Sequence, residues 1–415
     1  MNKKPIELLS PAGSFESLQA AIQAGADAVY FGVEQLNMRA KSINSFSVDD
    51  LKTIIAECKP RGIKNYLTLN TVLYDHDMQL MRSIVQHAKE YGIDAIIASD
   101  FAVIQLCSEM KMPVHISTQA NVSNIESVQF FSRFADVIVL ARELTLKQTE
   151  SITKEIRRKK ITGFSGQPLK IEVFAHGALC MAISGKCYLS LHQQNASANR
   201  GACTQVCRRP YKVTDAESGE ELLIDNEYIM SPKDLCTIDI LDQVIASGID
   251  VLKIEGRGKG PEYVYEVTRC YREAIDAIER RTYSADKISE WKDRLSSVYN
   301  RGFWEGYYLG RKLGEWTPHP GSAATEKKIY IGKCTRYYGG IQVGEFLLES
   351  GSIQKGDTIL ITGSRFGIHK EVLNDFRVNG EEEDIAGKGD KITFPLPLKP
   401  SLNDKLYKMV KTEHA

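Results

Sequence analysis

The stretch Met78-Gln-Leu-Met-Arg-Ser-Ile-Val-Gln-His-Ala-Lys-Glu-Tyr91, followed by Gly92-Ile-Asp-Ala-Ile-Ile-Ala98, shows the repeating unit of this chain. Its first part places apolar residues three and four positions apart, which predicts an amphipathic helix. A glycine turn follows, and then a short apolar run that is typical of a strand buried on both faces. The stretch therefore predicts a helix that leads into a buried parallel strand.

The same unit recurs through the first 280 of the 415 residues. Apolar runs predict eight strands, at Ile6–Leu9, Ala28–Phe31, Asn65–Leu69, Ala95–Ala98, Pro113–Ile116, Val137–Leu140, Ile171–Phe174 and Val251–Ile254. Helical patterns lie at Phe15–Ala24, Val48–Cys58, Met78–Tyr91, Phe101–Met110, Ile125–Phe134, Leu146–Arg157, Asp234–Ser247 and Pro261–Arg280. Eight such units predict an α/β protein with a (β/α)₈ TIM-like barrel, and a doubly wound open sheet is the alternative.

One unit is much longer than the others. About 60 residues separate the strand that ends near Phe174 from the helix expected at Asp234, far more than an ordinary βα loop contains. We therefore expect a cysteine-rich insert after strand 7, at about 176–235. In a barrel this loop opens on the C-terminal face, where active sites are built.

The composition changes again after Trp316. The segment Thr317-Pro-His-Pro-Gly-Ser-Ala-Ala predicts a linker at 317–326, so the barrel domain is expected at 1–316. From 327 to 415, short strands separated by turns predict a small C-terminal all-β barrel.

Five of the nine cysteines lie within 57 residues of each other: Cys180, Cys187, Cys203, Cys207 and Cys236. We find no secretory signal and no apolar run long enough to span a membrane, so we expect a cytoplasmic protein with reduced thiols. Clustered thiols then indicate an iron–sulfur cluster, a zinc site or redox-active thiols. The spacing of Cys180 and Cys187 does not fit a structural zinc knuckle, but the pattern leaves all three possibilities open.

The total charge of the chain is balanced, but one segment has an excess of basic residues that indicates an anionic partner. Lys plus Arg equals Asp plus Glu at 53 each, yet ten basic residues and one acidic residue lie between Arg157 and Lys212. This excess predicts a polyanion or a small anionic substrate, and a solvated basic face is the alternative. Common metallopeptidase, serine-hydrolase and phosphate-loop motifs are absent from the sequence, so a hydrolytic mechanism would have to rest on His176 and a cysteine.

Polar residues that follow the predicted strands would line the mouth of the barrel. We expect catalytic roles for His176, Glu255 and Arg257. We expect substrate binding by Asn70, Gln119 and Arg142. Structural hydrogen bonding is the alternative for Asn70, Gln119, Arg142, His176 and Glu255.

Several motifs together resemble the collagenase-like family of unassigned peptidases, the thirty-second in that series. They include Glu172-x-Phe-x-His-Gly-Ala-Leu-Cys-x-x-x-Ser-Gly-x-Cys, Asn199-Arg-Gly-x-Cys-x-x-x-Cys-Arg, Ser231-x-Lys-Asp-Leu and Leu252-Lys-Ile-Glu-Gly-Arg. Members of this length look like proteins that hydroxylate the tRNA wobble uridine to 5-hydroxyuridine, with oxygen from prephenate rather than O₂. The C-terminal part resembles the translation-factor-type β-barrel of the longer members.

The resemblance implies a four-iron, four-sulfur cluster on Cys180, Cys187, Cys203 and Cys236, with Cys207 as a further candidate and zinc as the alternative metal. It also implies tRNA and prephenate as partners. Both are anionic, so we expect a basic rim at Arg200, Arg208, Arg209 and Arg257. The family name leaves a metal- or cysteine-dependent peptidase as the alternative function. A third possibility is a non-catalytic partner of a shorter homologous subunit.

Overall fold

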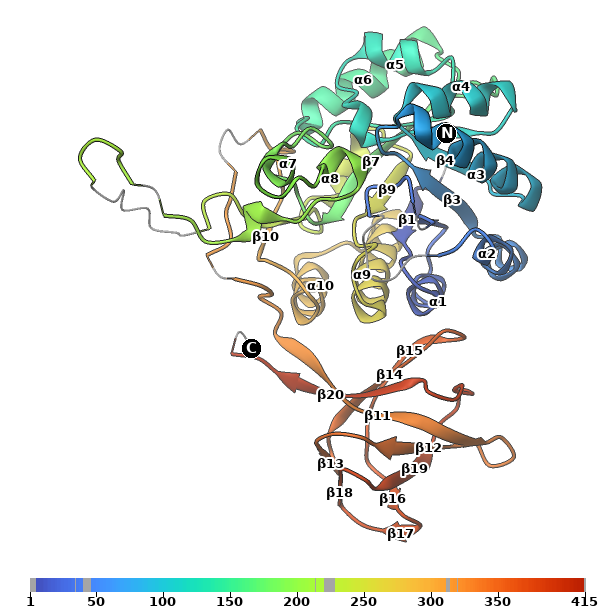
Figure 1. Ribbon diagram of the computed structural model, residues 1–415, viewed down its shortest axis with the longest axis vertical. Coiled ribbons are helices and arrows are strands. Elements are labelled where there is room, and N and C mark those ends of the chain that lie inside the picture. The colour runs from blue at the N-terminus through green and yellow to red at the C-terminus, as the bar shows by residue number, and fades with distance from the viewer. Residues whose placement is uncertain are drawn as a thin grey trace.

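Eight parallel strands close into a barrel (Figure 1) in the computed structural model, which describes residues 5–413 apart from 34, 40–45, 213, 220–227, 311–313 and 319. The strands are β1 (Glu7–Pro11), β2 (Ala28–Phe31), β3 (Lys64–Leu69), β4 (Ala95–Ala98), β5 (Val114–Ile116), β6 (Val137–Val139), β7 (Lys170–Gly177) and β9 (Val251–Ile254). They pair in chain order, and β9 joins β7 to β1 to complete the ring. The predicted TIM-like barrel is confirmed, and the doubly wound alternative is wrong.

Helices cover the outside of the barrel, as the periodicity predicts. They are α1 (Phe15–Gln23), α2 (Asp50–Cys58), α3 (Met78–Tyr91), α4 (Phe101–Glu109), α5 (Ile125–Phe131), α6 (Leu146–Lys159), α8 (Leu241–Ala246), α9 (Pro261–Glu279) and α10 (Ala285–Ser297). Gly92 ends α3 at φ 92° and turns the chain into β4, which a residue with a side chain rarely does. Among the described residues, no helix is both long and apolar enough to cross a membrane.

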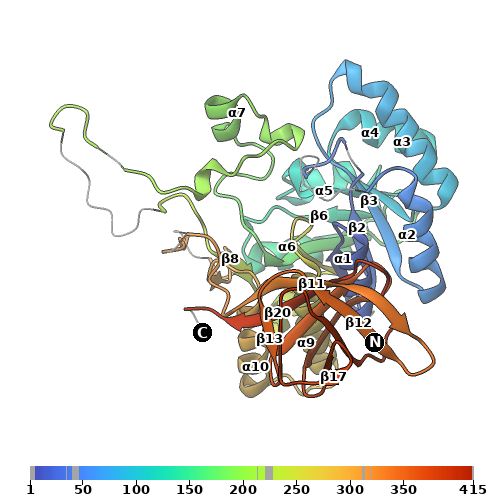
Figure 2. The same cartoon turned by 60° about the horizontal axis from the view of Figure 1, so that its bottom comes forward.

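The insert departs from a regular βα unit. Asp234–Cys236 forms a short strand, β8, where the sequence predicts the start of a helix, so that helical boundary is wrong. Because β7 continues to Gly177, its end offers backbone partners beyond the barrel, and β8 pairs antiparallel with it. Strand β10 (Phe303–Trp304) then pairs with β8. Helix α7 (Leu189–Gln194) lies in the insert, away from the C-terminal unit (Figure 2).

The C-terminal unit is antiparallel β structure. Its strands are β11 (Glu326–Tyr338), β12 (Val343–Leu348), β13 (Ser352–Gln354), β14 (Thr358–Gly363), β15 (Gly367–Val372), β16 (Arg377–Val378), β17 (Glu381–Glu382), β18 (Ile385–Gly387), β19 (Lys391–Pro395) and β20 (Lys405–Lys411). Eight of them form one sheet ordered β15-β14-β20-β11-β12-β19-β16-β17. Its apolar face encloses a separate core in which Phe346 stacks on Phe394. The predicted all-β unit is confirmed. Across residues 326–411, all of which are described, no pairing joins β15 to β17, so its hydrogen-bonded sheet is open.

The C-terminal unit packs against the outer helices of the barrel rather than against its mouth (Figure 1). Gln23 at the end of α1 donates to the Ile368 carbonyl at 3.1 Å. Lys328 on β11 pairs with Glu262 on α9 at 2.7 Å. Gly367 lies so close to α1 that a Cβ there would be 2.6 Å from the Ala20 nitrogen. This unit therefore leaves the carboxyl ends of the barrel strands open to the insert.

Candidate functional site

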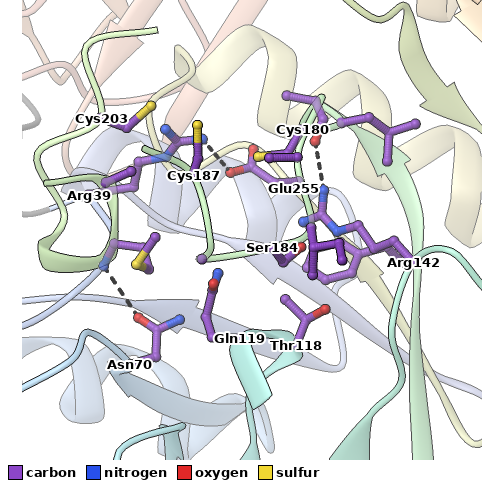
Figure 3. Close-up of a pocket in the computed structure, with 18 of the residues that line it drawn as sticks. Arg39, Asn70, Thr118, Gln119, Arg142, Cys180, Ser184, Cys187, Cys203 and Glu255 are labelled. Atoms are coloured by element: carbon purple, nitrogen blue, oxygen red, sulfur yellow. Dashed lines mark hydrogen bonds and ion pairs between the residues drawn. The ribbon is translucent and has the colours of Figure 1, made fainter. Parts of the chain in front are cut away.

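A pocket lies at the carboxyl ends of the barrel strands, beneath the insert (Figure 3). Several buried residues of its lining belong to the strands themselves, among them Tyr30, Ile97, Phe174 and Lys253. Loops after the strands form its walls, and the insert covers it. This is the face on which a barrel of this type carries its active site.

Four cysteines of the insert line the pocket: Cys180, Cys187, Cys203 and Cys207. Figure 3 shows the first three on one side of the cavity. Burial raises the pKa of the Cys207 thiol, Arg208 opposes this rise, and the other three thiols add to it because they lie near. In the described part of the chain, no group of three or more His, Cys, Asp or Glu side chains is drawn into a metal-binding arrangement. The number and type of donors nevertheless match an iron–sulfur cluster, which four thiolates hold.

Cys236 lies outside the pocket. It is on β8, it is 3% exposed, and the Tyr271 hydroxyl is 3.9 Å from its sulfur. Burial raises the pKa of its thiol to about 11. Because β8 extends the end of β7, Cys236 faces α9 instead of the barrel mouth. The structure groups Cys207, and not Cys236, with the other three thiols around the pocket, and the set of cluster ligands stays a prediction.

His176 also lies behind the pocket rather than in it. The pairing of β7 with β9 shifts register between Phe174 and His176, which changes the direction of the histidine side chain. Its ring packs among Tyr263, Tyr271 and Phe303, with centroids 5.5–6.1 Å away. Burial lowers the pKa of His176 to about 3, so the ring is neutral. The expected catalytic position of His176 is therefore corrected to a buried position behind the site.

Glu255 and Arg257 follow β9 and line the pocket, where the architecture predicts them. Burial raises the pKa of Glu255, but Arg39, 2.9 Å away, and two further arginines outweigh it and lower the pKa to about 2. Burial lowers the pKa of Arg257 to about 10, and this guanidinium donates to Asn37 at 3.0 Å and to Thr68 at 2.6 Å. At neutral pH the site thus holds an ionised Glu255 and a cationic Arg257.

Asn70 and Gln119 line the pocket on the side opposite the cysteines (Figure 3). Asn70 donates to Ser117 at 3.2 Å and accepts from the Met38 nitrogen at 3.3 Å. The Oε1 atom of Gln119 is buried without a hydrogen-bond partner among the described residues. It faces Gly185 of the insert, where a Cβ would lie 1.9 Å from it. Gln119 is therefore in the contact between the barrel and its insert.

Two arginines hold the main chain just before the first cysteine of the insert. Arg142 donates to the Ala178 carbonyl at 2.8 Å. Arg208 donates to the Leu179 carbonyl at 2.6 Å and to the Pro232 carbonyl at 2.8 Å. Both guanidiniums line the pocket, but these bonds also fix the insert. Arg208 therefore positions the insert as well as lining the pocket, and its expected role in substrate binding stays a prediction.

Arg200 and Arg209 do not line the pocket. Arg200 forms an ion pair with Asp77, donates to the Val72 carbonyl at 3.0 Å and lies 4.3 Å from the Tyr74 ring centroid. These contacts anchor the insert to the loop after β3. Arg209 is exposed on the surface of the insert. Of the arginines expected at a basic rim, Arg209 is thus the one presented to solvent.

The pocket carries an excess of positive charge. Six cationic side chains line it: Arg39, Arg142, Arg208, Lys253, Arg257 and Arg301. Against them stand Glu255 in the lining, Glu172 at 2.8 Å from Lys253, and Asp234 at 2.8 Å from Arg301. Six cations and three carboxylates leave an excess of three positive charges. Such a cavity attracts an anionic ligand.

Four pocket residues, Arg39, Tyr30, Phe174 and Lys253, are not predicted by the sequence patterns. A signal for Lys253 is present, because it is a single charge within an apolar strand that is buried on both faces. Lysine is almost never fully buried unless it is paired. Arg39 carries no comparable signal, since it follows β2 in an irregular segment.

Comparison with known proteins identifies the family. The model described as peptidase family U32 matches residues 13–318. A collagenase of Porphyromonas gingivalis is 52% identical over 413 residues and covers the full length of both chains. The tRNA hydroxylation protein P1 of Bacillus subtilis is 34% identical over 322 residues, which are 75% of this chain and 72% of that protein. A 23S rRNA 5-hydroxycytidine synthase of Escherichia coli is 35% identical over 274 residues, or 66% of this chain and 40% of that protein. The chain is therefore a member of peptidase family U32.

Proposed function

We propose that this chain is an oxygen-independent RNA hydroxylase that converts the wobble uridine of tRNA to 5-hydroxyuridine, with prephenate as the oxygen donor. The observation that carries the proposal is the combination of four thiols and an excess of three positive charges around one barrel-mouth pocket. A relative named as a tRNA hydroxylation protein and another named as an rRNA 5-hydroxycytidine synthase support it.

Cys180, Cys187, Cys203 and Cys207 would hold a four-iron, four-sulfur cluster. When bound, such a cluster supplies one-electron redox chemistry. The cations of the pocket would bind the two carboxylates of prephenate, since guanidinium pairs with carboxylate through charge-assisted hydrogen bonds. Tyr30 and Phe174 offer aromatic surface to the ring of the same ligand.

The insert supplies features that suit an extruded nucleobase. Met181 and Ile183 line the pocket and are 46% and 53% exposed, which places apolar side chains at its lip. Arg209 is exposed on the same insert and would contact phosphate. Enzymes that act on a base within a folded nucleic acid take it out of its stack into such a pocket.

A peptidase is the second candidate, because the 52% identical relative is named a collagenase. Overall similarity favours this name over the hydroxylase name. The pocket geometry favours the hydroxylase, because the described residues of its lining include four cysteines and no histidine. A cysteine nucleophile requires an adjacent base, and the buried His176 lies behind the site.

Two measurements test the proposal. Nucleoside analysis of tRNA should show loss of 5-hydroxyuridine in a strain that lacks this protein and any paralogue, and restoration by the intact gene. Anaerobically purified protein should be brown and contain iron and acid-labile sulfide. Unchanged 5-hydroxyuridine in that strain would refute the hydroxylase, and cleavage of gelatin by colourless protein would support the peptidase.

A further inference from the structure

Lys253 places a buried primary amine in the lining of the pocket. Its side chain is 5% exposed on β9, yet it belongs to the pocket lining. The Nζ atom lies 2.8 Å from Oε1 of Glu172 and 4.4 Å from the centroid of the Tyr30 ring. The amine is therefore shielded from bulk water but adjacent to the cavity.

Glu172, the carboxylate that pairs with Lys253, makes only part of the hydrogen bonds that it can accept. Glu172 is fully buried, and its second oxygen has no hydrogen-bond partner among the described residues. That oxygen lies 3.8 Å from Nδ1 of His115, whose pKa burial lowers well below its usual value, so this ring is neutral. A buried ion pair with incomplete hydrogen bonding contributes little net stability. Stability alone therefore gives a weak reason for a lysine at this position.

Burial also makes proton transfer within the pair easier. It raises the pKa of the Glu172 carboxyl and lowers the pKa of the Lys253 ammonium, although each group opposes the change in the other. The two pKa values move toward each other, so the proton passes from amine to carboxylate at a smaller cost than in water. The product is a neutral amine, and a desolvated neutral lysine is a nucleophile toward carbonyl carbon.

We propose that Lys253 forms a Schiff base with a 2-oxo carboxylic acid bound in the pocket. Arg142 and Arg257 line the same cavity and act electrostatically on Lys253, so a carboxylate bound to them lies near the amine. The inference rests on the anionic small substrate of the proposed function. It depends neither on the iron–sulfur cluster nor on RNA.

The step balances without any oxidant or reductant. Glu172 takes one proton from Lys253, and the amine nitrogen attacks the carbonyl carbon to form a nitrogen–carbon bond. A proton moves from that nitrogen to the oxygen and gives the carbinolamine. Glu172 then returns its proton to the hydroxyl, the carbon–oxygen bond breaks, and water leaves. The result is a protonated imine beside an ionised Glu172, and hydrolysis reverses the sequence.

Borohydride trapping tests this inference on the full chain. The protein is incubated with pyruvate or phenylpyruvate, reduced with sodium borohydride and analysed by intact mass and peptide mapping. We expect one reduced adduct per chain, on the peptide that contains Lys253, and none in Lys253→Arg, which keeps a cation but cannot form the imine. Acetate, which lacks a reactive carbonyl, should give no adduct.

Lys259 is the matched control, because burial lowers its pKa to about 8 and it lies six residues away. Lys259→Arg should retain the adduct. An adduct confined to Lys259 or to surface lysines, or no adduct in the wild-type protein, would overturn the inference. Because mapping is done on the wild type, the result does not depend on the folding of a variant. An adduct at Lys253 in a protein without effect on tRNA would instead refute the proposed function alone.

Discussion

Replacing Lys253 by methionine should destabilise the barrel by about 3 kcal/mol at neutral pH, because removal of one partner leaves a buried carboxylate unpaired. Glu172 is fully buried and loses the 2.8 Å bond from Lys253. The free energy of unfolding can be measured by urea denaturation, followed by circular dichroism. A variant in which Glu172→Leu accompanies Lys253→Met should recover most of the loss, since apolar residues often replace a buried pair at no net cost.

The loss should depend on pH with a definite sign. Without Lys253, burial and the Glu7 carboxylate act unopposed on Glu172 and raise its pKa further above the ordinary value. A carboxyl with a raised pKa binds its proton more tightly in the folded state, so the folded state is favoured at low pH and loses stability as pH rises toward the raised pKa. The cost of Lys253→Met should therefore be smaller near pH 5 than near pH 8.

An exposed pair provides the control for this prediction. Lys154 and Glu150 on α6 are 2.7 Å apart, with side chains 66% and 43% exposed. Lys154→Met should cost less than about 1 kcal/mol, because solvent screens exposed pairs. Equal costs for Lys253→Met and Lys154→Met, or a double variant as unstable as the single one, would refute the interpretation of Glu172 and Lys253 as a buried, coupled pair.

Two further predictions concern how the insert is held. Arg208→Gln removes the donors to two buried carbonyls, and each lost hydrogen-bond partner costs about 1–3 kcal/mol. Amide hydrogen exchange of the insert should therefore accelerate at least tenfold. Arg209→Gln changes an exposed side chain and should leave the exchange rate unchanged. Equal exchange in the two variants would contradict the positioning role. Gly185→Ala should lower the thermal midpoint of unfolding more than Gly166→Ala. Both glycines have a positive φ, near +74° and +79°, but only at Gly185 would a Cβ clash, 1.9 Å from Oε1 of Gln119. Similar shifts of the midpoint in the two variants would show that the contact between Gly185 and Gln119 is not tight.

The sequence predicts the barrel well because each strand and helix carries its own periodic signal. The predicted helix Met78–Tyr91 and strand Ala95–Ala98 coincide with α3 and β4. The strand β8 is different: it has three residues, and the free end of β7 supplies its backbone partners. A local sequence pattern does not contain that contact, so it predicts a helix at this position instead.

Architecture also predicts which polar residues reach the barrel mouth, as long as the register of the strand is regular. Asn70, Arg142 and Glu255 follow regular strands and line the pocket. His176 follows a register shift, which the alternation of side chains does not reveal. Cys236 pairs opposite His176 and faces the same buried side, so both residues lie outside the pocket for the same reason.

Anaerobic reconstitution with iron and sulfide, applied to two serine variants, determines which thiols around the pocket hold the proposed cluster. Cys207→Ser removes a thiol that lines the pocket, and Cys236→Ser removes one that is buried beside Tyr271. If Cys207 is the fourth ligand, Cys236→Ser binds as much iron and sulfide as the wild type and has the same visible spectrum, and Cys207→Ser loses most of both. A full cluster in Cys207→Ser together with its loss in Cys236→Ser, at equal folding by circular dichroism, would show that Cys236 is the ligand instead.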